Sequence, residues 1–145
     1  MTKQLYGIIA ACMLTAALCT GIYGIFLYSP VAAAVYAAGC IILMIGFVYA
    51  YCTKCPIRYN CVHVLMGLMT RLMPRREEAP YTRCDLTGVV MFFGFVAFFP
   101  QYWLVRDPAL FLLFWFLFIG EWLLTHFTCC RGCGNIFCRM RSDEG

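Results

Sequence analysis

The chain has 145 residues, of which 63% are hydrophobic and only 12% are charged, and its mean hydropathy is +0.80. A soluble domain of this size cannot bury so large an apolar fraction, so the composition excludes an ordinary soluble globular protein. The net charge of +4 comes from basic residues dispersed among loops, which argues against a nucleic-acid partner.

Four long apolar stretches occupy residues 5–28, 31–51, 86–105 and 109–128. Each is about the length that crosses the ~30 Å hydrocarbon core of a bilayer as an α-helix. Helices are the expected form because lipid offers no water to backbone polar groups. The first stretch is too long for the core of a signal peptide, so we expect a retained helix. The sequence thus predicts one all-α membrane domain over residues 1–145, with four transmembrane helices in two hairpins.

The basic residues predict the orientation of these helices. Of the 11 Lys and Arg residues, Arg106 alone lies between the third and fourth stretches. The others flank the N-terminus, the loop of residues 52–85 and the tail of residues 129–145. The positive-inside rule therefore places both termini and this long loop in the cytoplasm. We expect a multi-pass protein of the inner (cytoplasmic) membrane, with the lipid bilayer as its first partner.

The loop of residues 52–85 has an organisation of its own. Residues 61–73 are mainly apolar, stop at Pro74 and are too short to span a bilayer. A short helix is expected there, lying in the membrane interface or packed under the bundle. Asp85 precedes the third apolar stretch and is predicted to be its N-cap residue.

Two cysteine-rich groups begin where the second and fourth apolar stretches end. The cytoplasm is reducing, so disulfides are disfavoured there, and Cys-x-x-Cys pairs in that setting more often bind metal or carry out redox chemistry. Two such pairs from separate elements can close one tetrahedral site. We therefore predict a cytoplasmic cap in which both groups form one composite metal site. The predicted ligands are Cys52, Cys55, Cys61 and His63 in the first group, and Cys129, Cys130, Cys133 and Cys138 in the second.

The pattern leaves the metal open between an iron–sulfur cluster and zinc. Cys55 is followed by Pro56, and there are more thiols than one zinc ion needs, which favours a cluster. Residues 130–135 look like a zinc-ribbon knuckle, and His63 would complete a set of three cysteines and one histidine, which favours zinc.

Two side chains near the end of the fourth stretch are predicted to contact a cofactor. Glu121 lies inside the membrane, where a carboxylate is costly and a functional role is the default hypothesis. It is a proton relay, a quinone contact or a partner for a loop arginine, and the alternative is a protonated acid or one that reaches the interface. His126, like His63, lies near the cytoplasmic boundary and is a structural residue or an extra ligand.

For the remaining residues of the apolar stretches we expect packing roles. The many phenylalanines of the last two stretches are expected to face lipid or fill the bundle, with a quinone site as the alternative. Cys12, Cys19 and Cys40 are expected to pack as small apolar side chains. A soft-metal transporter would need them as a path through the bilayer.

These features predict a small accessory or electron-transfer subunit that passes electrons between a soluble protein partner at the cytoplasmic face and the membrane. The chain has no phosphate-binding loop and no dinucleotide fingerprint, so a stand-alone enzyme is the less expected class. One alternative is a structural or interaction protein in which zinc clamps the long loop to the C-terminal tail. Another is a thiol–quinone oxidoreductase or a soft-metal transporter.

Overall fold

The computed structural model describes residues 3–57, 61, 63–77, 79–130, 135 and 137, and every regular element among them is helical. Four helices are long and apolar enough to cross a membrane. The prediction of an all-helical chain with four such helices is therefore confirmed. The candidate spans are Gln4–Phe26, Pro30–Lys54, Arg83–Leu104 and Pro108–Thr128.

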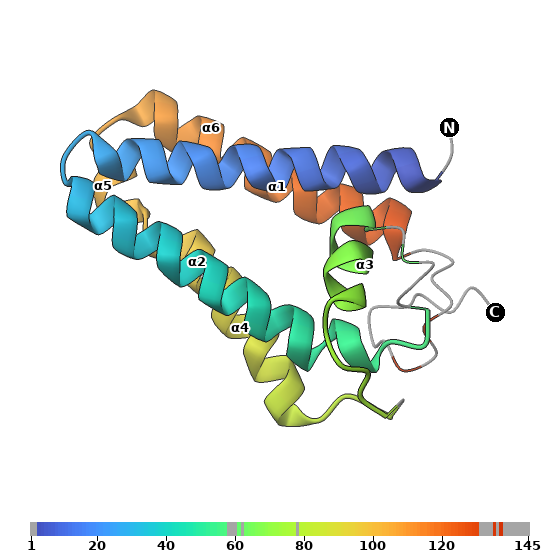
Figure 1. The fold of residues 1–145 in the computed structure, drawn as a ribbon. Helices are drawn as coiled ribbons and strands as arrows, with labels where there is room; N and C mark the ends of the chain where they lie inside the picture. The colour runs from blue at the N-terminus through green and yellow to red at the C-terminus, as the bar shows by residue number, and fades with distance from the viewer. Residues whose placement is uncertain are drawn as a thin grey trace.

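The first two long helices are α1 (Lys3–Phe26) and α2 (Pro30–Ala50), joined by a tight turn. Ser29 is the N-cap of α2, and its side chain accepts a hydrogen bond from the backbone N–H of Ala32 at 3.2 Å. Pro30 follows at the first helical position, where a missing N–H costs no helical hydrogen bond. From this turn the two helices diverge, so the space between them widens toward the other end of the bundle (Figure 1).

A short helix occupies part of that space. After the 3-10 turn η1 (Cys52–Lys54), the chain forms α3 (Val64–Arg71), which contacts α1, α2 and η1. In Figure 1, α3 runs across the direction of α1, between the diverging α1 and α2. The predicted short helix is thus present and packs against the bundle.

The third candidate span is not one continuous helix, as the sequence had suggested for residues 86–105. It consists of α4 (Arg83–Phe98) and α5 (Gln101–Leu104), separated by a turn that contains Pro100. Proline has no N–H for the carbonyl four residues before it, which here is that of Val96. Tyr36 of α2 supplies the missing donor, since its hydroxyl donates to the Val96 carbonyl at 3.0 Å. The carbonyl group that the proline leaves without a helical donor therefore accepts a hydrogen bond from a neighbouring helix.

Gln101 satisfies a second carbonyl at the break and links it to the last helix. Its side-chain Nε2 donates to the carbonyl of Ala97 at 2.5 Å, and its Oε1 accepts from Trp115 Nε1 at 3.1 Å. Trp115 belongs to α6 (Pro108–Leu124), which begins at the N-cap Asp107 and continues into the π-helical turn η3 (Thr125–Cys129). The break at Pro100 thus leaves both carbonyls bonded.

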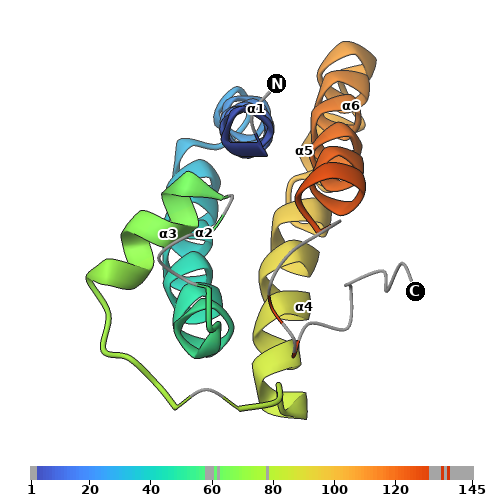
Figure 2. The same ribbon diagram turned by 90° about the vertical axis from the view of Figure 1, so that its right-hand side faces the viewer.

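The four long helices pair across the sequence. α1 packs most extensively against α6, and α2 against α4, in addition to the contact of α1 with α2. Figures 1 and 2 show these two pairs side by side. Most interhelical contact therefore joins the first two helices to the last two, rather than one helix to the next in the chain.

The buried core follows these pairs. One cluster lies mainly between α2 and α4, and a second lies between α1, α5 and α6. The phenylalanine rings divide between core and surface: Phe92 and Phe114 are fully buried, whereas Phe98 and Phe116 are 74% and 71% exposed. Both expected positions of the rings therefore occur. The first cluster comprises Ile25, Ala33, Tyr36, Cys40, Phe92 and Val96, and the second Ala17, Leu104 and Phe114.

Glycine allows close contact at two of these interfaces. A Cβ atom at Gly39 of α2 would lie 2.7 Å from the ring of Phe95 on α4. A Cβ atom at Gly120 of α6 would lie 2.5 Å from the terminal methyl group of Met13 on α1. Small residues at such positions let membrane helices approach closely.

Candidate functional site

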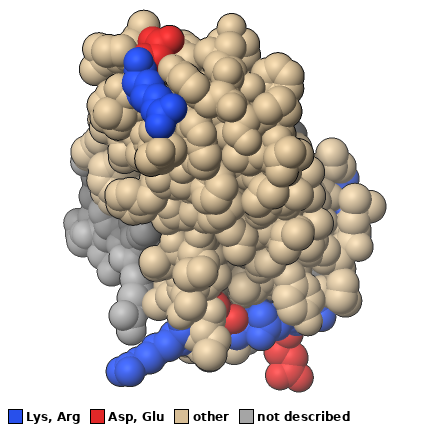
Figure 3. Space-filling model, turned by 90° about the vertical axis from the view of Figure 1, so that its left-hand side faces the viewer, with Lys and Arg blue, Asp and Glu red and all other residues tan. Residues whose placement is uncertain are grey.

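Charged side chains gather at the two ends of the bundle. Arg106 and Asp107 lie at the turn between α5 and α6, with Arg106 over the rings of Tyr28 and Tyr102 at 5.2 and 4.9 Å. Most other described charges lie at the opposite end, where α2 and α6 end and α4 begins, and which we call the loop end. Figure 3, viewed from the end that carries the α1–α2 turn, shows one acidic and one basic group near the top and the other visible charges at the right and lower edges, with uncharged surface between them. This distribution is typical of a chain that spans a membrane.

A buried ion pair holds the loop end together. Lys54 Nζ lies 2.6 Å from Asp85 Oδ2, and the two side chains are only 9% and 4% exposed. Thr82 adds two bonds to the same carboxylate oxygen, from its backbone N–H and its hydroxyl, both at 2.8 Å. The pair joins η1, which contains Cys52, to the start of α4.

Asp85 was predicted as the N-cap of this helix, and that prediction is wrong. Thr82 is the N-cap, its side chain accepting from the backbone N–H of Asp85 at 3.3 Å. Asp85 sits three residues later and closes a reciprocal capping box. The helix therefore begins three residues earlier than predicted, because Thr82 already offers its hydroxyl to the free N–H groups of the first turn.

Arg76 adds a third connection at the same place. Its Nη1 lies 3.3 Å from Asp85 Oδ1 and donates to the carbonyl of Ala50 at 3.4 Å. Its guanidinium also lies over the ring of Tyr49, 5.4 Å from the centroid. Since Ala50 is the last residue of α2, Arg76 binds a carbonyl that has no partner within the helix. The long loop is thereby fixed to the ends of both α2 and α4.

The first cysteine group lies at this loop end. The thiols of Cys55 and Cys61 are close enough to that of Cys52 to interact with it electrostatically. His63 stands directly before α3 and is partly buried. Burial lowers the pKa of His63, which favours the neutral imidazole, the form that binds metal ions.

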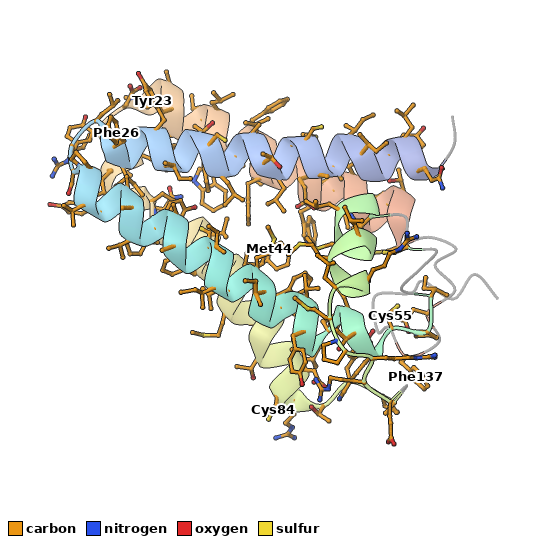
Figure 4. All side chains as sticks on the ribbon, viewed as in Figure 1. Tyr23, Phe26, Met44, Cys55, Cys84 and Phe137 are labelled. Carbon is orange, nitrogen blue, oxygen red and sulfur yellow. The ribbon has the colours of Figure 1, made fainter. Side chains whose placement is uncertain are left out.

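The segment that carries the second cysteine group starts at the same end. Its Asn135 contacts Tyr81, a residue that packs beside the first group. Asn135 is 3% exposed and donates from Nδ2 to the hydroxyl of Tyr81 at 2.8 Å. The ring of Tyr81 stacks on that of Tyr51, with 4.1 Å between centroids. Tyr51 is the residue immediately before Cys52. In Figure 4, Cys55 and Phe137 both lie at this end of the molecule.

The predicted ligands do not converge within the described residues. No group of three or more His, Cys, Asp or Glu side chains there is arranged to hold a metal ion. Cys130 is described and partly buried, whereas Cys133, Cys138 and the side chain of Cys129 lie outside the described residues. The composite site therefore stays a prediction, and the first group alone does not form it.

The predicted cofactor contacts, Glu121 and His126, are separate from each other. Glu121 is 6% exposed, and its carboxylate accepts from Thr125 Oγ1 at 3.0 Å. Among the described residues it forms no ion pair, so the suggested loop arginine is not seen there. His126 stacks on Trp122 at 5.6 Å and meets Phe127 edge-on at 5.2 Å. The contacts of the two side chains are thus different, and a cofactor role for either stays a prediction.

The three cysteines of the first two long helices differ in their surroundings. Cys12 and Cys19 are exposed on α1, whereas Cys40 is buried in the core between α2 and α4. Soft-metal transport through a row of thiols therefore has no support from their positions. Cys84, at the start of α4, is exposed as well.

Sequence reasoning missed the contacts that build the loop end. An acidic residue in the first turn of an apolar helix, opposite a basic loop, was the available signal for the Lys54–Asp85 pair. No such signal exists for the contact between Tyr81 and Asn135, which are 54 residues apart. No family model, curated protein or solved structure matches the chain, so its function has to be argued from the chemistry of the loop end.

Proposed function

We propose that this protein is a small integral membrane subunit, accessory or electron-transferring, whose loop end holds a Cys-ligated metal or iron–sulfur site on the cytoplasmic face. One observation carries the proposal. The contact of Asn135 with Tyr81, which stacks on Tyr51, ties the second cysteine group to the residue beside the first. Two ligand groups held at one place are what a composite site requires.

The ligands in this proposal come from both groups. Cys52, Cys55 and Cys61 lie near one another, yet no three ligands converge among the described residues. A site would therefore be completed by thiols of the second group, with Cys133 and Cys138 as the proposed contributors. Asn135 lies between these two positions in the chain and is itself buried, which supports their assignment to this end of the molecule.

The proposed orientation rests on charge. Basic side chains at the loop end, including Lys54, Arg71, Arg76 and Arg83, outnumber the single Arg106 at the other end. The positive-inside rule associates such an excess with the cytoplasm. A cytoplasmic site would meet a soluble partner protein there, which an accessory or electron-transfer subunit needs.

A zinc clamp is the second candidate. The buried Asn135 favours a zinc clamp as well, because it fastens the tail segment to the long loop. A structural zinc site does the same and needs no redox change. In that case the protein is a structural or interaction subunit, and the loop end is its docking surface.

Elemental analysis of anaerobically purified protein, with visible absorption and electron paramagnetic resonance spectra, tests these proposals. We expect bound iron with visible absorbance that bleaches on reduction. Colourless protein with stoichiometric zinc would replace electron transfer by the structural clamp, and protein without metal would overturn both. Cys55→Ser should abolish metal binding, whereas Cys12→Ser, a matched change at an exposed thiol of α1, should leave it unchanged.

A further inference from the structure

The short helix α3 has two different faces. Gly67 and Thr70 are buried against the bundle, and the Thr70 hydroxyl donates to the Gly67 carbonyl at 2.8 Å, so this face offers no free polar group to a ligand. The opposite face carries Leu65, Leu68 and Leu72, which are 40%, 57% and 86% exposed. Spacings of three and four residues put these leucines on one side of a helix. An apolar stripe is thus left uncovered.

The helix lies in the direction that a membrane surface would require. In Figure 1 α1 and α6 run in nearly the same direction, α2 and α4 are inclined to them, and α3 runs across α1. Viewed toward the loop end, α3 extends outward beside α2, away from α4 and α6 (Figure 2). An amphipathic helix that runs across the spanning direction can lie along one leaflet, with its apolar face toward the acyl chains.

Basic side chains accompany the apolar stripe. Arg71 is exposed in the last turn of α3, between Leu68 and Leu72 in the sequence, and Arg75 is exposed just beyond the helix. The next described acidic residue along the chain, Glu77, lies outside α3. Arginines beside an apolar helix face match the negative charge of lipid headgroups.

We infer that α3 docks on anionic phospholipids of the leaflet at the loop end. The exposed leucines enter the boundary between headgroups and acyl chains, and Arg71 pairs with a lipid phosphate. A protein partner would also cover an apolar stripe, but the direction of α3 across the spanning helices and the charge of Arg71 both favour a lipid surface. The inference rests on the membrane placement in the proposed function and is independent of any metal.

Hydrogen–deuterium exchange of the full chain in lipid nanodiscs tests this inference. One sample uses phosphatidylcholine alone, and the other an equimolar mixture with phosphatidylglycerol. We expect the amides of α3 to exchange more slowly in the anionic lipid, by about fivefold for each arginine that reaches the surface. Arg71→Gln should remove most of this difference. Leu68→Ser should speed the exchange of α3 in both lipids.

Arg83→Gln is the matched control, because Arg83 is an exposed arginine at the loop end that belongs to α4. It should leave the lipid dependence of α3 unchanged. Protected long helices with identical α3 exchange in both lipids would overturn the docking and leave the membrane placement intact. Freely exchanging long helices would overturn both, and an equal effect of Arg83→Gln would show that net charge, rather than α3, senses the lipid.

Discussion

Asp85→Asn is the substitution with the largest expected effect on the fold. It removes the negative charge that faces Lys54 Nζ at 2.6 Å, where the two side chains are 9% and 4% exposed. Breaking one partner of a buried ion pair leaves an uncompensated charge and costs about 3–5 kcal/mol. The second pair, with Arg76, adds about 0–1 kcal/mol because the arginine side chain is one-third exposed. An asparagine still accepts hydrogen bonds, so the capping contribution is largely kept.

The assay is equilibrium unfolding in mixed detergent micelles, followed by circular dichroism. We expect the free energy of unfolding to fall by about 3–5 kcal/mol for Asp85→Asn. Lys54→Met should cost less, about 1–3 kcal/mol, because Asp85 keeps its bonds from Thr82 and Arg76. The double variant should cost less than the sum of the two, since the residues are in contact.

Asp107→Asn is the matched control for this experiment. It makes the same chemical change at the partly buried N-cap of α6, where asparagine caps as well as aspartate. Its effect should stay within about 0.5 kcal/mol. A loss for Asp85→Asn no larger than that of the control would refute the reasoning, because the buried pair would then contribute nothing to stability.

Two further predictions concern the helix interfaces and use the same unfolding assay. Tyr36→Phe should cost about 1–3 kcal/mol by leaving the buried carbonyl of Val96 without a donor. In a Pro100→Ala background the same change should cost much less, because alanine supplies the missing N–H; an undiminished cost would contradict this account of the break. Gly39→Ala should cost about 1–3 kcal/mol by pressing a methyl group against a phenylalanine ring of α4. Gly46→Ala, where nothing lies within 4 Å of the added carbon, should instead stabilise the helix by about 0.5–1 kcal/mol.

The long helices were predictable because the length and apolarity of a membrane span are local properties of the sequence. The boundaries of α1, α2 and α6 fall within a few residues of those expected. Pro100 alone does not predict the break between α4 and α5, since a proline inside a membrane helix can be accommodated by neighbouring helices. Which neighbour does so depends on the packing of α2 on α4, and hydropathy says nothing about that contact.

For the loop end, the sequence indicated which residues are of interest but not how they contact one another. Cysteine spacing and basic charge marked the segment, and the described start of the second group lies at the same end as the first, while the composite cap stays a prediction. The buried pair of Lys54 with Asp85 was not foreseen, because Asp85 had a simpler explanation as a helix cap. Long-range contacts such as Asn135 with Tyr81 depend on how separate helices pack and leave no local pattern.

The hydrogen bond from Tyr36 to Val96 has a consequence for how the chain enters a membrane. A carbonyl without a donor in lipid is costly, so α4 is incomplete as an isolated span until Tyr36 reaches it. Because α2 precedes α4 in the chain, Tyr36 is made before the carbonyl that it serves. We therefore expect insertion of the third candidate span to be coupled to its association with the second.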